Sequence, residues 1–329
     1  MQITDCKMRT AKLRNCLTLI GIVLLGLAGC NSAASTGTDQ SAAGPKTDKV
    51  LSIVCTTGQV GDMVANIGGE HVKVETLMGP GVDPHLYRGT LADTQKLNRA
   101  DAVFYNGLHL EGRLAESLES LASRKPTFAI TEDIVAKAPE LLRKPDEFNG
   151  NYDPHVWFDV SLWARCADTV AKRLMELDPP HAEDYRRRSA EYVAKLTKLH
   201  DQCKSRIAEI PSDRRLLTTA HDAFGYFGRA YDIEVHGLQG ISTADEADLA
   251  SVNELVDLLV TRQVKAVFVE SSVPPKNIQS LIQGCASRGH TVVEGGELYS
   301  DAMGPAGTPE ANYIGMVEHN VNTIVRALK

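Results

Sequence analysis

The chain has 329 residues, of which 43% are hydrophobic and 23% are charged. This length suits one large or two medium domains, and the composition excludes a disordered chain, a collagen-like repeat and a small disulfide scaffold. The formal net charge is −7, and it becomes −10 when Lys7, Arg9, Lys12 and Arg14 are set aside together with Asp5. Because no long basic run follows, we expect no nucleic-acid partner, whereas cation binding is compatible with this balance.

Residues 1–29 have the order of features found in a bacterial export signal. A basic stretch precedes the apolar run 17–28, which is shorter than the roughly 20 residues of a membrane-spanning helix. The segment ends in Leu27-Ala28-Gly29-Cys30, which resembles the lipobox at which the signal is cleaved and the cysteine lipidated. We therefore predict a signal peptide over 1–29 and lipid attachment at Cys30. The alternative is a plain signal peptide with an incidental cysteine.

Residues 30–49 are mostly Ser, Ala, Thr, Gly and Asp, a composition too polar to form a core. We predict that they form a tether between the lipid and the folded part. No later apolar run reaches the length of a membrane span. The folded part is therefore expected outside the cytoplasm, held at a bacterial membrane by its lipid.

From residue 50 onward, short apolar runs of strand length alternate with helical patterns. Four runs fall in the first half and four in the second: 51–55, 72–77, 102–105, 127–130, 216–219, 233–236, 266–270 and 291–294. This alternation predicts an α/β fold of two lobes with mainly parallel four-stranded sheets. We place the lobes at 50–178 and 211–329.

Residues 179–210, between the lobes, are predicted to form one long connecting helix. It begins at a proline pair, ends before Pro211 and carries one apolar stripe. The stripe consists of Tyr185, Tyr192, Leu196, Leu199, Cys203 and Ile207. A helix of this length measures about 45 Å, so we expect a rigid rod that joins the lobes. The alternative is a helix packed within one lobe.

The four cysteines of the folded part are widely spaced: Cys55, Cys166, Cys203 and Cys285. No pair has the spacing of a metal site, and the sequence does not select one disulfide pairing over another. Their apolar surroundings favour buried, unpaired side chains.

Three histidines and one aspartate occupy positions that suit metal ligands. His85 and His155 each end an Asp-Pro-His tripeptide in a loop, where proline restricts the backbone and presents the imidazole rigidly. His221 follows the strand 216–219, and Asp301 lies in the loop after the last strand. Ligand sites gather at such carboxyl ends of parallel strands. Three imidazoles and one carboxylate complete the shell of one divalent transition metal, with two ligands from each lobe.

Each of these histidines taken alone is more typical of a surface or hydrogen-bonded loop residue. The joint pattern is what favours a metal site. His109 also lies near a strand end and is a further histidine that could contact the site, with entry into a helix as its alternative role.

Four acidic residues near these positions are candidates for orienting the imidazoles or other donors: Asp83, Asp153, Asp222 and Glu270. Histidine ligands normally donate their second N–H to a carboxylate or a carbonyl. The alternative for these residues is local capping or turn formation, which Asp before Pro commonly provides.

Several motifs in both lobes carry a resemblance to a known family. They are the lipobox ending in Cys30, residues 81–87, Tyr-Asn-Gly-Leu-His-Leu-Glu at 105–111, Asp-Pro-His-Val-Trp at 153–157, Thr-Ala-His-Asp-Ala-Phe at 219–224, Gly-Leu-Gln-Gly-Ile-Ser at 237–242 and Phe-Val-Glu at 268–270. The chain resembles, over essentially all residues from 50 onward, the TroA-like metal-receptor lipoproteins of bacterial ABC importers. The resemblance implies metal ligands at His85, His155, His221 and Asp301, and two lobes joined by a rigid helix. It also implies a monomeric receptor that delivers zinc, manganese or iron to the permease subunits.

Two details of the resemblance bear on the metal. Zinc-dedicated members often carry a His-rich loop between the first two ligands, yet residues 110–153 contain no histidine. Manganese-dedicated members usually have Glu at the third ligand position, where this chain has His221. Because nitrogen-rich shells suit zinc, we expect zinc, with manganese or iron next.

Two other functions stay open from the sequence. The first is a secreted metal-dependent hydrolase with Glu270 or Glu297 as general base, although neither lies in a His-Glu-x-x-His helix. The second is a metal-binding surface adhesin. A complete set of four protein ligands favours capture over catalysis, because catalytic zinc keeps one position open.

Overall fold

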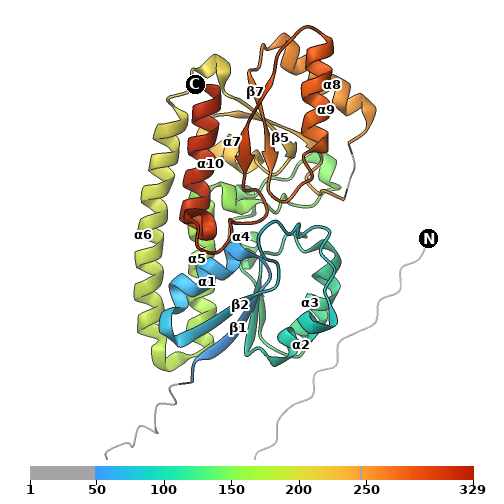
Figure 1. The fold of residues 1–329 in the computed structure, drawn as a ribbon. Coiled ribbons are helices and arrows are strands. Elements are labelled where there is room, and N and C mark those ends of the chain that lie inside the picture. The colour runs from blue at the N-terminus through green and yellow to red at the C-terminus, as the bar shows by residue number, and fades with distance from the viewer. Residues whose placement is uncertain (1–48, 245–246) are drawn as a thin grey trace, which may run out of the picture. The chain divides into compact units, whose positions relative to one another are not determined.

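The computed structural model describes residues 49–244 and 247–329, and in them strands alternate with helices as predicted (Figure 1). The predicted signal peptide, the lipid-attachment residue Cys30 and the predicted tether up to residue 48 lie outside the described residues. Every helix within the described ranges is too short or too polar to cross a bilayer.

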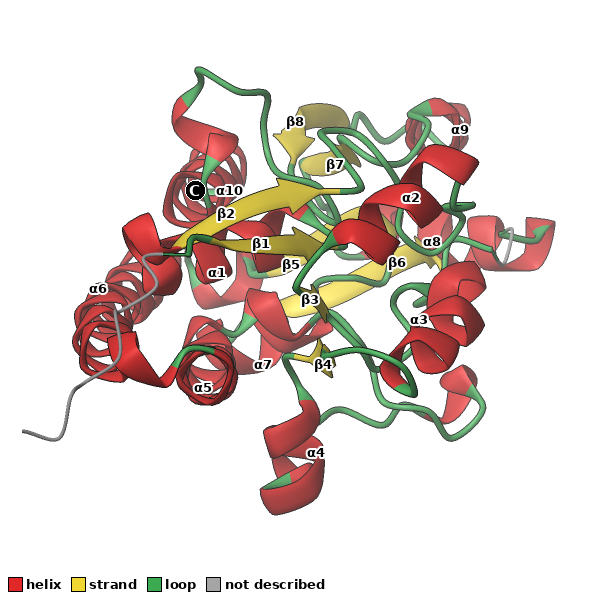
Figure 2. Cartoon of the chain, turned by 90° about the horizontal axis from the view of Figure 1, so that it is seen from below, coloured by secondary structure: helices red, strands yellow, loops and turns green. Residues whose placement is uncertain are grey.

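The first lobe contains one parallel sheet of four strands in the order β2-β1-β3-β4 (Figure 2). The strands are β1 (Leu51–Cys55), β2 (Val72–Thr76), β3 (Ala102–Tyr105) and β4 (Thr127–Ala129). The helices of this part are α1 (Gly58–Gly68), α2 (Leu91–Arg99), α3 (Ala115–Ala122), α4 (Glu132–Lys137) and α5 (Val160–Leu177). The predicted strands 72–77 and 127–130 are each one residue longer than the observed ones.

Helices cover both faces of this sheet. Ile53 and Cys55 belong to the same core cluster as α1 and α5. Val54 points to the other face and packs in a separate cluster with Leu97 of α2 and Leu118 of α3. A strand buried on both faces has no polar side to show, which explains the near-continuous apolar runs of the sequence.

The second lobe also has four parallel strands, but they form two hydrogen-bonded pairs instead of the predicted four-stranded sheet. The pairs are β5 (Leu216–His221) with β6 (Glu234–Gln239), and β7 (Ala266–Glu270) with β8 (Val293–Leu298). The strands β5 and β7 lie next to each other. An apolar run predicts a strand but not its hydrogen-bonding neighbour, which depends on how the strands pack.

The predicted limits of three strands in this lobe were short or displaced. The predicted strand 216–219 extends to His221, and the predicted strands 233–236 and 291–294 begin and end too early. The strand β8 reads Val-Glu-Gly-Gly-Glu-Leu and is mostly exposed, so it gives no apolar signal. The helices of this lobe are α7 (Gly225–Tyr231), α8 (Leu249–Thr261), α9 (Lys276–Ser287) and α10 (Tyr313–Leu328).

The predicted connecting helix is α6 (Ala182–Ile207), preceded by a short 3-10 turn at Pro179–His181. Its 26 residues span about 39 Å at 1.5 Å per residue. It packs against α1 and α5 and also against α7 and α10, so it runs beside both lobes (Figure 1). All six residues of the predicted stripe are buried. The residue limits that we assigned to the lobes stay predictions.

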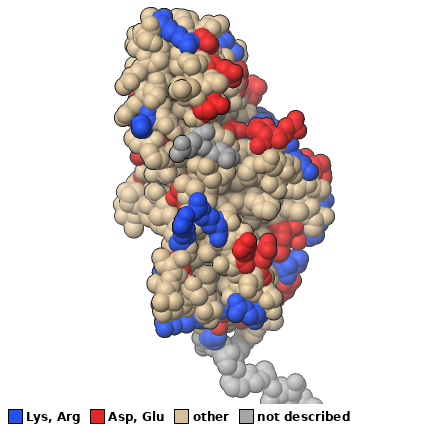
Figure 3. All heavy atoms as spheres, turned by 90° about the vertical axis from the view of Figure 1, so that its right-hand side faces the viewer, with Lys and Arg blue, Asp and Glu red and all other residues tan. Residues whose placement is uncertain are grey.

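One hydrophobic core extends from the first lobe through α6 into the second, and all described residues lie in one compact unit. The four cysteines are buried and free, as the sequence favoured. On the face shown in Figure 3, the described Lys and Arg side chains are interspersed with Asp and Glu and do not gather into one basic patch.

The shared core makes α6 a testable link between the lobes. Leu196 is fully buried in the middle of the helix, so Leu196→Ala is expected to lower the free energy of unfolding by about 2–5 kcal/mol through loss of packing. Lys198→Ala changes an exposed residue of the same helix and should stay within about 0.5 kcal/mol of wild type. Urea unfolding followed by circular dichroism measures both. Equal stability of the two variants would contradict the shared core.

Candidate metal centre

Two loops of the first lobe present His85 and His155 in the same way. In each Asp-Pro-His tripeptide the Asp side chain accepts a hydrogen bond from the backbone N–H of the histidine, at 2.8 Å for Asp83 and 3.0 Å for Asp153. This turn is the local role that Asp before Pro commonly has. The repeated turn, with φ fixed by proline, sets the direction of both imidazoles.

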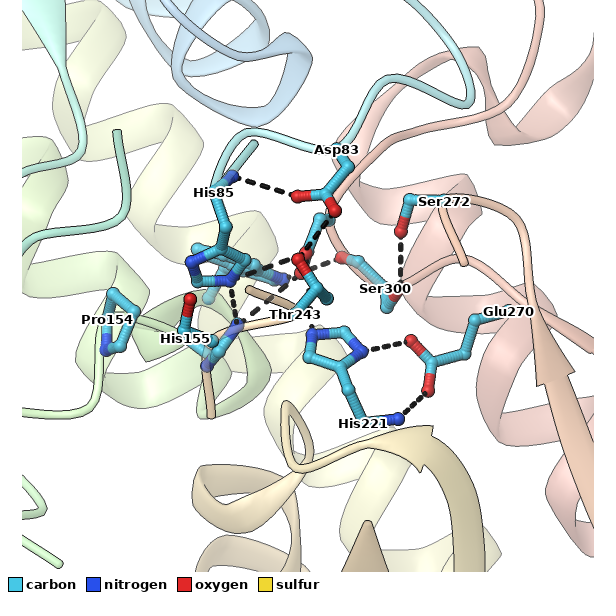
Figure 4. A network of polar contacts seen from close by, with 12 residues as sticks. Asp83, His85, Pro154, His155, His221, Thr243, Glu270, Ser272 and Ser300 are labelled. Atoms are coloured by element: carbon cyan, nitrogen blue, oxygen red, sulfur yellow. Dashed lines mark hydrogen bonds and ion pairs between the residues drawn. The ribbon is translucent and has the colours of Figure 1, made fainter. Parts of the chain in front are cut away.

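Carboxylates orient two of the histidine rings, and Figure 4 shows one of these pairs, Glu270 with His221. Asp153 Oδ1 lies 2.8 Å from His155 Nδ1, and Glu270 Oε2 lies 2.5 Å from His221 Nδ1. Glu270 also accepts the backbone N–H of His221 at 2.9 Å. Because an ionised carboxylate only accepts, Nδ1 carries a proton in both rings, and Nε2 of each ring faces the carboxylate of Asp301.

Asp301 comes from the second half of the chain, but the loop that carries it is bonded to the first lobe. The carbonyl oxygen of Ser300 accepts hydrogen bonds from Trp157 Nε1 at 3.0 Å and from Gln59 Nε2 at 3.5 Å. The Ser300 hydroxyl lies 2.9 Å from the hydroxyl of Ser272, which follows β7. The position of Asp301 is therefore fixed from both lobes.

The ligand-type atoms of these four residues lie within 4.8 Å of one another, and Figure 4 shows the three histidines close together. The Nε2 atoms of His85 and His155 are 3.3 Å apart. The carboxylate oxygens of Asp301 lie 3.4 Å from Nε2 of His221, 3.5 Å from that of His155 and 3.6 Å from that of His85. A tetrahedron of ligands at zinc distances has edges of about 3.3–3.6 Å. The four distances fall within this range, and no two of the ligand atoms are more than 4.8 Å apart, so the cluster has the size of a site for one ion.

The cluster is closed off from solvent. His155 and His221 are 0% exposed, Asp301 2% and His85 4%. His221 Nε2 and both carboxylate oxygens of Asp301 are buried without a hydrogen-bond partner. Since buried polar atoms are nearly always paired, this donor set is suited to a cation at its centre.

Burial and charge set different protonation states within the cluster. Burial lowers the pKa of His85 to about 3. Burial also opposes a charge on His221, but the carboxylates of Glu270 and Asp301 outweigh it and raise the pKa of His221 well above the usual value. Burial likewise opposes ionisation of Asp301, yet the facing histidines hold its pKa well below the usual range. A cation bound to Nε2 of His221 must therefore displace a proton.

The structure brings together all four predicted ligands, whereas the predicted orienting residues divide. Asp153 and Glu270 contact histidine rings, as expected. Asp83 bonds to the backbone of His85 and not to its ring. The carboxylate of Asp222 makes no hydrogen bond to a histidine ring within the described ranges, so an orienting role for it stays a prediction. Burial raises the pKa of Asp222.

His109 does not join the site. Its side chain is exposed, with φ of 66° in the loop after β3.

Several residues of the site were not predicted from the sequence. Thr243 donates a hydrogen bond of 2.6 Å to the second oxygen of Asp83 and links the loops of the two lobes. Gln59, Ser300 and Arg143 also contact the site or its orienting residues. Trp157 and Ser300 are sequence neighbours of ligands, which is a usable signal. Gln59, Thr243 and Arg143 lie far from any ligand in the sequence and give none.

The comparisons with known proteins agree with this geometry. Residues 53–327 match the family ZnuA, described as zinc-uptake complex component A, periplasmic. The chain belongs to this family. The ZnuA match covers both lobes and all four residues of the cluster.

Two curated relatives are close in sequence. The manganese-binding lipoprotein MntA of Bacillus subtilis is 47% identical over 90% of this chain and 95% of its own length. The zinc-binding protein TroA of Treponema pallidum is 45% identical over 84% of this chain and 88% of its own. The solved structure of the periplasmic zinc binding protein TroA superimposes with a TM-score of 0.81 at 44% identity, covering 84% of this chain and 99% of that one. The likeness confirms the two-lobed α/β fold with its long helix.

The protonation pattern predicts an NMR titration of the metal-free protein. His85, whose pKa of about 3 lies below its usual value, should stay neutral between pH 8 and 5. His221, whose pKa lies above its usual value, should stay protonated when the pH rises through 6.5, the range in which an ordinary histidine loses its proton. Long-range ¹H–¹⁵N spectra of the imidazoles measure both. Midpoints near 6.5 for both rings would contradict the electrostatic arrangement.

Proposed function

We propose that this protein is the substrate-binding component of a bacterial ABC importer for a divalent transition metal. It captures the ion between its lobes at His85, His155, His221 and Asp301 and delivers it to the permease in the membrane. The observation that carries this proposal is the convergence of four buried ligand-type atoms that all lie within 4.8 Å of one another. The relatives named above are a manganese-binding lipoprotein and a zinc-binding protein.

The anchored state follows from the sequence and from the relatives. Relatives such as SloC of Streptococcus mutans are metal ABC transporter substrate-binding lipoproteins. The lipobox supports lipid attachment at Cys30, and we propose a monomeric receptor that is held outside the cytoplasm at the membrane of its permease.

Capture and release agree better with the site than catalysis does. A catalytic zinc keeps a position open for water or substrate, whereas this cluster offers four protein ligands and is 0–4% exposed. Both carboxylate oxygens of Glu270 bond to His221, and Glu297 is exposed, so neither is placed as a general base. The hydrolase and the adhesin are not favoured.

The link between the lobes supports delivery by a limited opening. Asp83 and Thr243 join the ligand loop of the first lobe to the second lobe, and α6 holds the lobes on the other side through a shared core. We expect the loops around the metal to separate while α6 stays in place.

Zinc is the metal we propose, with manganese or iron next. Three nitrogens and one carboxylate form a set that suits zinc, and the distances from Asp301 to the three histidines and from His85 to His155 match the edges of a tetrahedral site. Manganese favours oxygen-rich shells and binds more weakly to a given set of ligands.

Removal of one ligand tests the site. His155→Ala and His221→Ala should each abolish most of the metal affinity, because three ligands remain in a dry site that was shaped for four. The thermal midpoint of the metal-free protein should change little, whereas the increase in the midpoint on addition of Zn²⁺ should be lost. Isothermal titration and differential scanning calorimetry measure the two effects.

His236→Ala is the matched control, because the His236 ring is partly exposed and, in the described part of the chain, bonds to Glu234 and to no residue of the cluster. It should bind Zn²⁺ as the wild type does. Tight binding of one equivalent of Zn²⁺ by both ligand variants would show that the assignment of the site is wrong.

Competition between metals tests the choice of zinc. Equimolar Zn²⁺ should displace Mn²⁺ from the wild-type protein at pH 7, measured by elemental analysis after gel filtration, and protein purified from its native envelope should contain zinc. Retention of Mn²⁺ against equimolar Zn²⁺ would overturn zinc as the metal and leave the transport proposal intact.

A further inference from the structure

Arg143 lies outside the cluster of ligand atoms but is bonded to one of its orienting residues. Its guanidinium donates to Asp153 Oδ2, while Asp153 Oδ1 accepts both the backbone N–H and the ring Nδ1–H of His155. The Asp153 side chain is 0% exposed. A buried carboxylate is stabilised by a charged partner or by several hydrogen bonds, and among the described residues Arg143 is the one Arg or Lys that pairs with Asp153.

The other orienting carboxylate has no such partner. Glu270 is 3% exposed and bonds with both oxygens to His221. Within the described ranges it forms no ion pair with Arg or Lys. The two histidine–carboxylate pairs thus differ. Among the described residues, the carboxylate of the first-lobe pair, Asp153, is bonded to an arginine, and that of the second-lobe pair, Glu270, is not.

The second lobe holds Arg143 in place. The backbone N–H of Arg143 donates to the Tyr226 hydroxyl at 3.0 Å, and that hydroxyl donates to the backbone carbonyl of Asp153 at 2.9 Å. The guanidinium carbon lies 5.8 Å from the centre of the Tyr226 ring. Tyr226 of helix α7 therefore contacts both Arg143 and Asp153.

The guanidinium group of Arg143 occupies the space where a side chain at position 225 would begin. A Cβ built on Gly225 would lie 1.3 Å from Arg143 Nη1 and 1.9 Å from Cζ. Gly225 is the first residue of α7 and does not have a positive φ. Its lack of a side chain therefore serves the contact with Arg143 and not the backbone conformation.

We propose that Arg143 is a positioning residue of the metal site: seated against Gly225 and Tyr226 of the second lobe, it orients Asp153 and through it the His155 ring. This inference rests on the proposed metal-binding function. Gly225 and Tyr226 belong to the second lobe and His155 to the first, so the orientation of the His155 ring depends on how the two lobes pack together. A shift of α7 away from the first lobe would release Arg143 and loosen His155.

The test measures binding of Co²⁺, whose visible absorption reports on coordination, to the full-length protein and its variants. Arg143→Gln should lower Co²⁺ affinity about 10- to 100-fold, the usual effect of removing a partner of a metal-ligating histidine, and should change the absorption spectrum. Arg143→Lys keeps the charge and should recover part of the affinity. Arg229→Gln is the matched control, because Arg229 also lies over the Tyr226 ring, at 5.0 Å, but pairs with Asp159 and not with Asp153.

A double-mutant cycle separates positioning from a merely structural role. If Arg143 acts through Asp153, Arg143→Gln should change the affinity less than twofold in an Asp153→Asn background.

A substitution in the second lobe tests the contact with α7. Gly225→Ala should lower the Co²⁺ affinity as Arg143→Gln does, even though alanine has a higher helix propensity than glycine.

Three results would overturn the proposal. They are wild-type Co²⁺ affinity and spectrum in Arg143→Gln, losses that add in full in the double mutant, and unchanged affinity in Gly225→Ala. A wild-type protein that binds no Co²⁺ would contradict the proposed function and this inference with it. Thermal melts of the metal-free variants check that each one is folded.

Discussion

The burial of His221 Nε2 and both oxygens of Asp301 without hydrogen-bond partners is the constraint on which the rest of the structure depends. Groups of this kind are costly to remove from water unless they meet an opposite charge. The fold holds these groups in place through contacts of the neighbouring residues. Glu270 holds His221 by ring and backbone, and Trp157 holds the loop that carries Asp301. The site is thus preorganised around a position that only a cation suits.

The architecture explains how a loop-built site stays so well defined. Each ligand follows or ends a short, stiff element: an Asp-Pro-His turn for His85 and His155, the last residue of β5 for His221, and the loop after β8 for Asp301. Both lobes share one core with α6. Because a packed core resists deformation, the two lobes keep a fixed arrangement, and the four ligands keep their positions relative to one another.

The two oriented histidines lie in different electrostatic surroundings. His155 faces a carboxylate whose charge is balanced by Arg143, whereas His221 faces Glu270 and Asp301, which raise its pKa in the metal-free protein. Metal binding at His221 is consequently coupled to release of a proton. The orientation of His155 is instead coupled to the contact between Arg143 and α7. Binding of the ion is therefore coupled to a proton at His221 and to a packing contact between the lobes at His155.

The sequence by itself determined the order of strands and helices, the buried stripe of α6 and the four residues of the cluster, because these depend on local periodicity and on loop motifs that proline stiffens. Three features needed the tertiary structure. The pairing of β5 with β6 and of β7 with β8, the contact of Thr243 with Asp83, and the seat of Arg143 on Gly225 all join residues that the sequence does not relate. Asp222 shows the same limit, since it is next to His221 in the chain but its carboxylate makes no hydrogen bond to a histidine ring among the described residues. A side chain's position in a motif is local, whereas its partners are chosen by how distant segments pack.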